Sequence, residues 1–195
     1  MNSCERDFID QIRKTLSSRE RRVIQHPSFA HAAVLVPLFR KGADCHILFT
    51  KRTDLVKYHK GEISFPGGVF DKEDLDLERT ALREAHEEIG LKENDVQVMG
   101  VLDDIVTITE FVVTPFVGHF PYPYPFKPSP IEIAEMIEVP ILSLLDKKCF
   151  SEREIIRMGQ KELIYEFQYG NHVIWGATGR ILKQFLDLIS SSINT

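Results

Sequence analysis

The sequence predicts an α/β fold, with helices packed on a mixed β-sheet and the whole of residues 1–195 in one domain. Apolar runs with the length of strands, such as residues 31–39, are interspersed with amphipathic stretches that have helical spacing. Two or three helices among several strands are typical of an α/β/α sandwich. A chain of this length can also bury about 70% of its unfolded surface in one core.

The expected elements follow one another along the chain. An amphipathic helix is predicted over residues 5–17, because Phe8, Ile9, Ile12 and Leu16 share one stripe. A second helix ends at Gly90, a short helix starts at 141, and a last helix follows Trp175. Strands are predicted at 31–39, 45–50, 96–102, 111–120 and 132–139, with a hairpin made of 155–158 and 163–167 around Gly159-Gln160.

Residues 121–130, PYPYPFKPSP, contain five prolines and three aromatic residues. This composition predicts a stiff extended loop rather than a helix or strand. Exposed aromatic side chains tend to mark contacts, so we expect this loop to cover part of a substrate or a partner in a homodimer.

The stretch 61–91 carries most of the chemical information. Glu84, Glu87 and Glu88 stand at i, i+3 and i+4 of a helix, so their carboxylates share one face. This cluster weakens its own helix, because like charges repel and acids in the last turn oppose the helix dipole. Mg²⁺ and Mn²⁺ prefer carboxylate oxygens, which predicts a metal site. A solvated acidic helix face is the alternative.

The helix is preceded by Pro66-Gly67-Gly68. These residues predict a turn in which the backbone approaches a ligand closely and leaves a carbonyl free to face a cation.

Residues 68–91 resemble the Nudix box, G-x5-E-x7-R-E-U-x-E-E-x-G-U, in which U is a bulky aliphatic residue. The second half matches, with Ala85 at an aliphatic position. The first half is one residue longer, with fourteen residues between Gly68 and Arg83, and Asp74 stands at its acidic position. The resemblance implies the Nudix α/β/α sandwich with a mixed β-sheet. It also implies Mg²⁺ or Mn²⁺ ligands at Glu84, Glu87, Glu88 and the Gly68 carbonyl, with Arg83 orienting Glu87.

The preceding residues, 48–68, resemble a second motif, LLTxRS-x3-R-x3-G-x3-FPGG, of the coenzyme A pyrophosphatase branch of the Nudix hydrolases. Thr53 replaces Ser, and Lys57 replaces Arg. That branch also carries the one-residue insertion in the box. The resemblance implies hydrolysis of coenzyme A or an acyl derivative to 3′,5′-ADP and a 4′-phosphopantetheine.

Residues 51–60 are locally basic, with Lys51, Arg52, Lys57 and Lys60 against Asp54, in a chain of net charge −5. A basic segment beside an acidic metal site suits a substrate with several phosphates. We therefore expect Lys51, Arg52 and Lys57 to contact the substrate. The resemblance adds His59 and Gly67 to these expected contacts. A solvated loop is the alternative.

Three acids outside the box are candidates for an accessory metal ligand or a general base. Glu110 lies in a connecting segment, while Glu132 and Glu135 lie in the strand 132–139, where Nudix enzymes often carry such an acid. Charges that keep an edge strand soluble are the alternative for the last two. The base itself remains open between Glu84 and an acid outside the box.

Two other functions remain open. One is the same chemistry on another nucleotide, such as ADP-ribose, NADH, a capped RNA or a nucleoside triphosphate. The other is a binding module without activity, although such modules typically lose the acids that are present here. The net negative charge predicts no general attraction to nucleic acid or to membranes. Three cysteines without CxxC spacing predict a reducing compartment, and we expect the cytoplasm.

Overall fold

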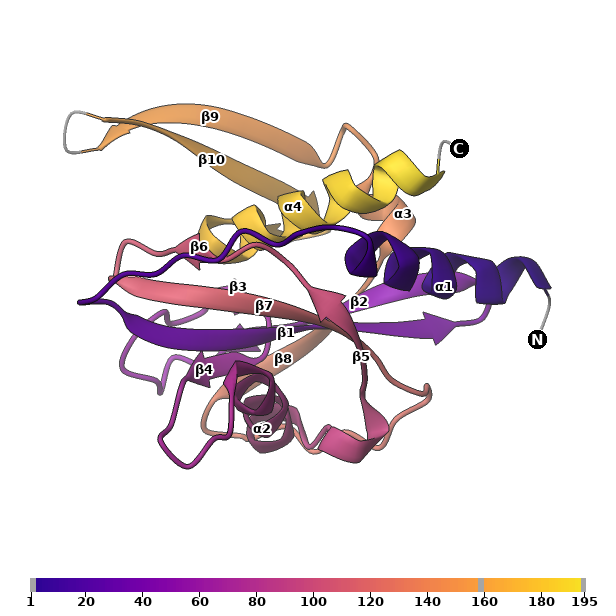
Figure 1. The fold of residues 1–195 in the computed structure, drawn as a ribbon, viewed down its shortest axis with the longest axis horizontal. Coiled ribbons are helices and arrows are strands. Elements are labelled where there is room, and N and C mark those ends of the chain that lie inside the picture. The colour runs from indigo at the N-terminus through magenta and orange to yellow at the C-terminus, as the bar shows by residue number, and fades with distance from the viewer. Residues whose placement is uncertain (1–2, 158–159, 194–195) are drawn as a thin grey trace.

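A computed structural model describes residues 3–157 and 160–193. Figure 1 shows a central sheet with α1 (Ser3–Ser17) and α4 (Gly176–Ile193) over one face and α2 (Leu77–Ile89) over the other. Two short elements, η1 (Glu93–Asp95) and α3 (Ile141–Leu144), lie in connections. The predicted α/β fold with a mixed sheet is therefore confirmed.

The central sheet is mixed because β1 and β7 run parallel while the other pairs run antiparallel. Its main order is β3-β2-β1-β7-β5, with β4 paired to β1, β6 to β7 and β8 to β2. The strands are β1 (Ala30–Lys41), β2 (Asp44–Arg52), β3 (Ile63–Ser64), β4 (Gly67–Val69), β5 (Gln97–Val101), β6 (Ile105–Val106), β7 (Phe111–His119) and β8 (Ile133–Pro140).

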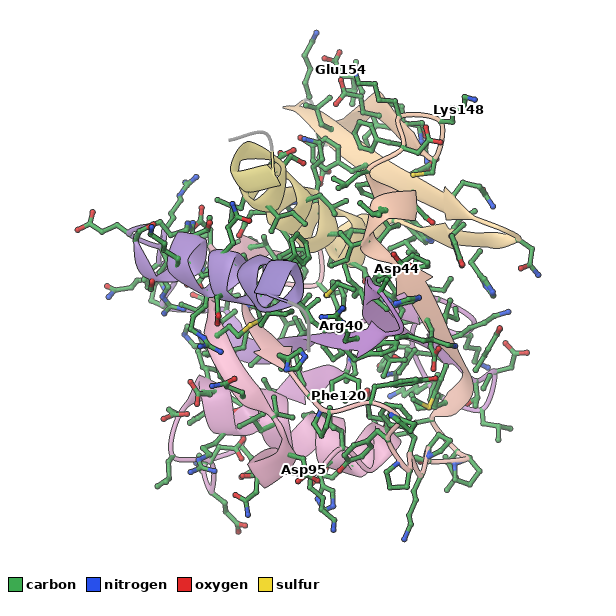
Figure 2. All side chains as sticks on the ribbon, turned by 90° about the vertical axis from the view of Figure 1, so that its right-hand side faces the viewer. Arg40, Asp44, Asp95, Phe120, Lys148 and Glu154 are labelled. Carbon is green, nitrogen blue, oxygen red and sulfur yellow. The ribbon has the colours of Figure 1, made fainter. Side chains whose placement is uncertain are left out.

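A second, antiparallel sheet has the order β11-β10-β9 and packs on α4. It consists of β9 (Phe150–Arg157), β10 (Gln160–Tyr169) and β11 (His172–Ile174). The predicted hairpin is present as β9 and β10, while Met158 and Gly159 lie outside the described residues. Figure 2 places this hairpin, marked by Glu154, at the opposite end of the molecule from Asp95 in η1.

Two apolar clusters fill the space on either side of the central sheet. The larger joins the sheet to α1 and α4 through residues such as Ile12, Phe49 and Phe185. The smaller joins it to α2 through Leu35, Ala85 and Ile89. Because β1 alternates between the two faces, it supplies residues to both clusters.

Two local expectations were wrong. Pro66-Gly67-Gly68 does not form a turn, since Gly67–Val69 is the strand β4, paired with Ala32–Val34 of β1. The aromatic residues of the proline-rich loop are not freely exposed either. Tyr122, Tyr124 and Phe126 are half-buried and pack on the cluster beneath α2, where Tyr122 stacks on Phe39 at 4.7 Å between ring centres. This long-range packing outweighs the local composition.

Candidate active site

Helix α2 carries the acids of the box, and its ends are well defined. The Asp76 carboxylate caps the first turn by accepting a hydrogen bond from the Arg79 N–H at 2.9 Å. Gly90 closes the last turn with a positive φ of 72°, a conformation that glycine adopts without strain. Ala81, Ala85 and Ile89 face the sheet.

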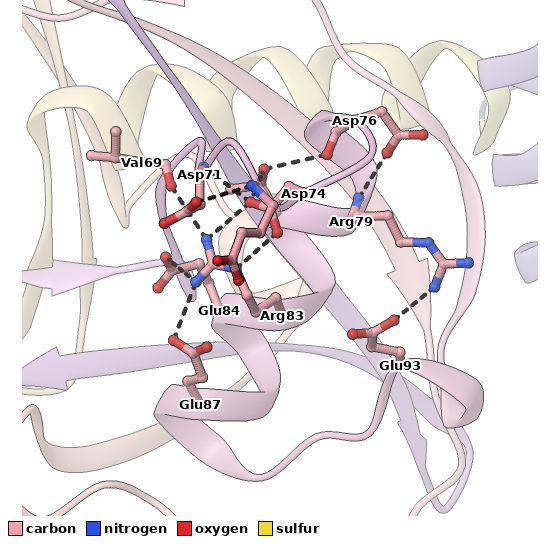
Figure 3. A network of polar contacts seen from close by, with 11 residues as sticks. Val69, Asp71, Asp74, Asp76, Arg79, Arg83, Glu84, Glu87 and Glu93 are labelled. Carbon is pink, nitrogen blue, oxygen red and sulfur yellow. Dashed lines mark hydrogen bonds and ion pairs between the residues drawn. The ribbon is translucent and has the colours of Figure 1, made fainter.

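Arg83 holds the carboxylates of this helix in place, as Figure 3 shows. One of its terminal nitrogens donates to Glu84 Oε1 at 2.8 Å and to Glu87 Oε2 at 3.2 Å. On its other edge the guanidinium binds both oxygens of Asp74, at 2.9 and 3.1 Å. Arg83 thus orients two of the predicted metal ligands, and the second of them, Glu87, is the one expected from the sequence.

Asp74 is an anchor for Arg83. The guanidinium holds the pKa of the Asp74 carboxyl down at about 2, with help from the Thr80 hydroxyl, which donates to it at 2.8 Å. The carboxylate therefore stays ionised at any physiological pH. The acid at the first position of the box fixes Arg83, and Arg83 in turn fixes Glu84 and Glu87.

The two glycines of β4 allow the backbone to lie close to its neighbours. A Cβ on Gly68 would lie 2.4 Å from the Glu84 carboxylate, and one on Gly67 would lie 2.4 Å from the Ala33 carbonyl oxygen. The requirement for glycine is therefore close approach rather than a turn.

The ladder between β1 and β4 shows which carbonyl is available. Leu35 donates to the Pro66 carbonyl at 2.8 Å, and Phe70 donates to the His31 carbonyl at 2.9 Å. Because bonded pairs alternate along an antiparallel ladder, Gly68 directs its N–H and C=O toward β1, while Gly67 directs its own away. The Gly67 backbone lies near enough to the Glu88 carboxylate to favour its ionised form and so to lower its pKa. The backbone carbonyl that faces the side of β4 where Glu88 lies is thus that of Gly67. The sequence had suggested the carbonyl of the next residue, Gly68, as the metal ligand.

Glu88 is the most buried acid of the cluster, with a side chain that is only 3% exposed. Its Oε1 lies 3.5 Å from a terminal nitrogen of Arg52. Its Oε2 and the Arg52 Nε are buried atoms that have no hydrogen-bond partner among the described residues. Burial raises the pKa of Glu88 to about 8, and the charges of Glu132 and Glu84 add to this rise, while Arg52 opposes it.

Glu132 approaches the box because the segment before β8 is bonded to the end of α2. Ser129 N–H donates to the Glu88 carbonyl at 2.8 Å, and Lys127 N–H donates to the Ile89 carbonyl at 2.9 Å. The Glu132 charge contributes to the raised pKa of both Glu84 and Glu88, with burial as the main cause for each. Among the three candidate accessory acids, Glu132 is therefore the one whose charge acts on Glu84 and Glu88 of the box.

This arrangement suits a cation. Across residues 3–157 and 160–193, no three His, Cys, Asp or Glu side chains stand close enough together to form a ready-made metal site. However, Glu84, Glu88 and Glu132 repel one another, and Glu88 has a buried oxygen with no partner among the described residues. A divalent cation would offset this repulsion and bind the buried oxygen, since hard cations prefer carboxylate and carbonyl oxygens. The residues present therefore fit the metal that was expected.

The contacts of the other predicted residues are with groups outside this cluster. Lys51 lies opposite Ile63 and Glu135 in the sheet, and exposed Lys57 has its ammonium 5.0 Å from the centre of the Tyr58 ring. His59 pairs with Glu62 at 2.9 Å. Glu135 pairs with His172 of β11 at 3.4 Å, and Glu110 is exposed in the turn before β7.

Comparison with known proteins decides the family. The NUDIX domain matches residues 29–136, which is more than half of the 195-residue chain. The chain belongs to the Nudix family. Its relatives include proteins named "Uncharacterized Nudix hydrolase NudL". The one from Photorhabdus laumondii is 34% identical over 91% of this chain and 94% of its own length. The one from Pectobacterium atrosepticum is 35% identical over 94% of each chain.

Solved structures agree on the Nudix fold. A MutT/nudix family protein from Enterococcus faecalis aligns over 97% of this chain and 75% of its own, with a TM-score of 0.54 and 13% identity. A NUDIX hydrolase from Alicyclobacillus acidocaldarius aligns over 88% of this chain and 98% of its own, with a TM-score of 0.53 and 18% identity. At these identities the likeness concerns the fold alone. Within the part of the Nudix chain that the structure describes, no helix is long and apolar enough to cross a membrane.

Proposed function

We propose that this Nudix hydrolase cuts the diphosphate of coenzyme A, or of an acyl-coenzyme A, to 3′,5′-ADP and a 4′-phosphopantetheine. The observation that carries the proposal is the contact between Arg52 and Glu88. Arg52 belongs to the upstream motif of the coenzyme A branch, and Glu88 belongs to the Nudix box. The side chains of the two motifs meet in one place, as a shared substrate site requires.

Glu84, Glu88 and Glu132, with the Gly67 carbonyl, would hold Mg²⁺ or Mn²⁺, and Glu87 would join them from the exposed side of α2. Bound there, the cation would supply charge neutralisation to the phosphate oxygens of the substrate. Arg83 contributes indirectly by fixing the positions of Glu84 and Glu87.

The chain's own residues supply two further contributions. The Arg52 side chain is 24% exposed, and its buried Nε has no hydrogen-bond partner among the described residues, which suits a charge-assisted hydrogen bond to a phosphate oxygen. Burial raises the pKa of Glu84, so this carboxylate is a better proton acceptor than an exposed one. Glu84 and Glu132 are the two candidates for the base that takes a proton from the attacking water.

The test is product analysis with coenzyme A, ADP-ribose and NADH in parallel, each with Mg²⁺ and then Mn²⁺. The proposal predicts 3′,5′-ADP from coenzyme A, formed faster than AMP from the other two. AMP from ADP-ribose or NADH with coenzyme A left intact would keep the Nudix chemistry and overturn the substrate. No product from any of the three would favour another nucleotide or a binding module.

A further inference from the structure

A pocket of about 310 Å³ lies beside the candidate active site. One wall comes from β3, β4 and the turn between β6 and β7. The other wall comes from residues 162–164 of β10, from Trp175, and from residues 176–178, 180 and 181 at the start of α4. The NUDIX match ends at residue 136, so this second wall is built from a part of the chain that the family domain does not include.

The pocket is continuous with the acid cluster through two residues. Arg52 and Gly67 both line it, and both also contact Glu88. A substrate whose diphosphate lies at the cluster would therefore have one of its two organic groups directed into this pocket.

The buried part of the pocket wall is apolar, and three of its polar lining side chains, those of Arg180, His59 and Glu62, are engaged in bonds of their own. Buried Ile63, Phe65, Val113 and Ile181 face the space. Arg180 donates to the Val106 carbonyl at 2.8 Å. His59 pairs with Glu62. A nucleobase is recognised through hydrogen bonds to its edges, and the buried apolar part of the wall offers none. They suit an aliphatic group.

The rim of the pocket is also apolar. Ile108, Leu163 and Trp175 line the pocket and are 69%, 46% and 44% exposed. Exposed apolar side chains around a cavity mark a binding surface for an apolar ligand. Leu163 comes from β10 and Trp175 from the connection between β11 and α4, so the part of the chain after the NUDIX match supplies two of the three rim residues.

We propose that this pocket binds the aliphatic arm of the substrate, the pantetheine side of coenzyme A, and leaves the nucleoside outside. The inference rests on the proposed function. In coenzyme A, the second carbon from the pantetheine phosphoester oxygen carries two methyl groups. The most apolar part of the arm would then lie closest to Arg52 and Gly67, at the mouth that opens to the cluster. Leu163 and Trp175 would contact the portion farther from the phosphate.

The chain contains a single tryptophan, Trp175, and this residue lies on the rim. Its fluorescence therefore reports occupancy of the pocket without any turnover. We would titrate the protein with 4′-phosphopantetheine and, separately, with 3′,5′-ADP. A saturable change with the first ligand and none with the second is the expected result.

Two variants and a control complete the test. Ala177→Phe places a large side chain at the pocket wall, and Leu163→Glu places a charge on the exposed rim, where folding is least at risk. Each should weaken binding of 4′-phosphopantetheine roughly tenfold or more, because apolar contacts in such pockets are worth about that factor. Leu142→Ser removes an exposed apolar residue of α3 away from the pocket and should leave the titration unchanged.

A fluorescence response to 3′,5′-ADP alone would assign the pocket to the nucleoside and overturn the inference. So would no response to either ligand, or equal binding by the wild type and Leu163→Glu. Failure of the proposed function gives a different pattern, in which 4′-phosphopantetheine still titrates Trp175 while intact coenzyme A is not hydrolysed.

Discussion

Arg83 holds three carboxylates with one guanidinium, namely those of Asp74, Glu84 and Glu87. The fork of Arg matches the two oxygens of Asp74 and still leaves a nitrogen for the other two acids. Lysine carries one compact charge and cannot make all of these bonds. Arg83→Lys should therefore lower kcat by about 10- to 100-fold, the usual effect of losing a residue that orients metal ligands.

The matched control is Arg79→Lys. Arg79 lies one turn earlier on α2 and pairs with Glu93 at the surface. An exposed ion pair of this kind contributes little, so kcat should stay near the wild-type value. Equal losses in the two variants would show that Arg83 acts only through the stability of the helix.

Glu88 makes stability depend on pH in the metal-free protein. Its pKa rises from 4.5 to about 8 on folding, mainly through burial. Between these two values the folded state keeps a proton that the unfolded chain has lost. The free energy of unfolding therefore falls as the pH rises through this window, by up to about 1.4 kcal/mol per pH unit.

Glu88→Gln removes this titration. With EDTA present, the Tm of the variant should fall less than that of the wild type between about pH 4.5 and about pH 8. Glu87→Gln is the control, because the Glu87 side chain is 57% exposed, and its curve should follow that of the wild type. Parallel curves for Glu88→Gln and the wild type would argue against a buried neutral acid.

Among the elements, the strand β4 packs its backbone closely against both β1 and Glu84 of the box. Its two glycines have different neighbours, so alanine should have different effects at each. A Cβ on Gly68 meets the end of a flexible side chain, Glu84, which can move. A Cβ on Gly67 meets the backbone oxygen of Ala33, which cannot move without disturbing β1.

Gly68→Ala should thus lower activity strongly while the Tm changes little. Gly67→Ala should lower the Tm itself. Steady-state assays and thermal unfolding of the two variants provide the measurement. A lower Tm for Gly68→Ala, with the activity per folded molecule unchanged, would contradict this prediction.

The elements also show how far the sequence could be read. The box helix was predictable because its acids, its apolar spacing and Gly90 all lie within a few residues of one another. The strand β4 was not, because Pro-Gly-Gly favours a turn locally, and only the pairing with Ala32–Val34 of β1 makes it a strand. The link between Glu132 and the box depends on bonds from Lys127 and Ser129 to the end of α2, which no local pattern reveals.

At the scale of the whole molecule, the Nudix core and the C-terminal part contribute different things. The Nudix core supplies the acid cluster, and the sequence motifs identified most of the acids in that cluster. The second sheet and α4 supply one wall of the pocket. The sequence showed their secondary structure but not their position over β3, β4 and the turn between β6 and β7, since that position depends on packing between segments more than fifty residues apart.

Hydrolysis of the coenzyme A diphosphate by the acid cluster is tested most directly by the rate at which 3′,5′-ADP forms from coenzyme A with Mg²⁺, for the wild type and Glu84→Gln side by side. We expect 3′,5′-ADP and 4′-phosphopantetheine from the wild type. For the variant we expect a rate lower by more than about 100-fold, with unchanged circular dichroism. Equal rates for the two proteins would rule out hydrolysis by this cluster.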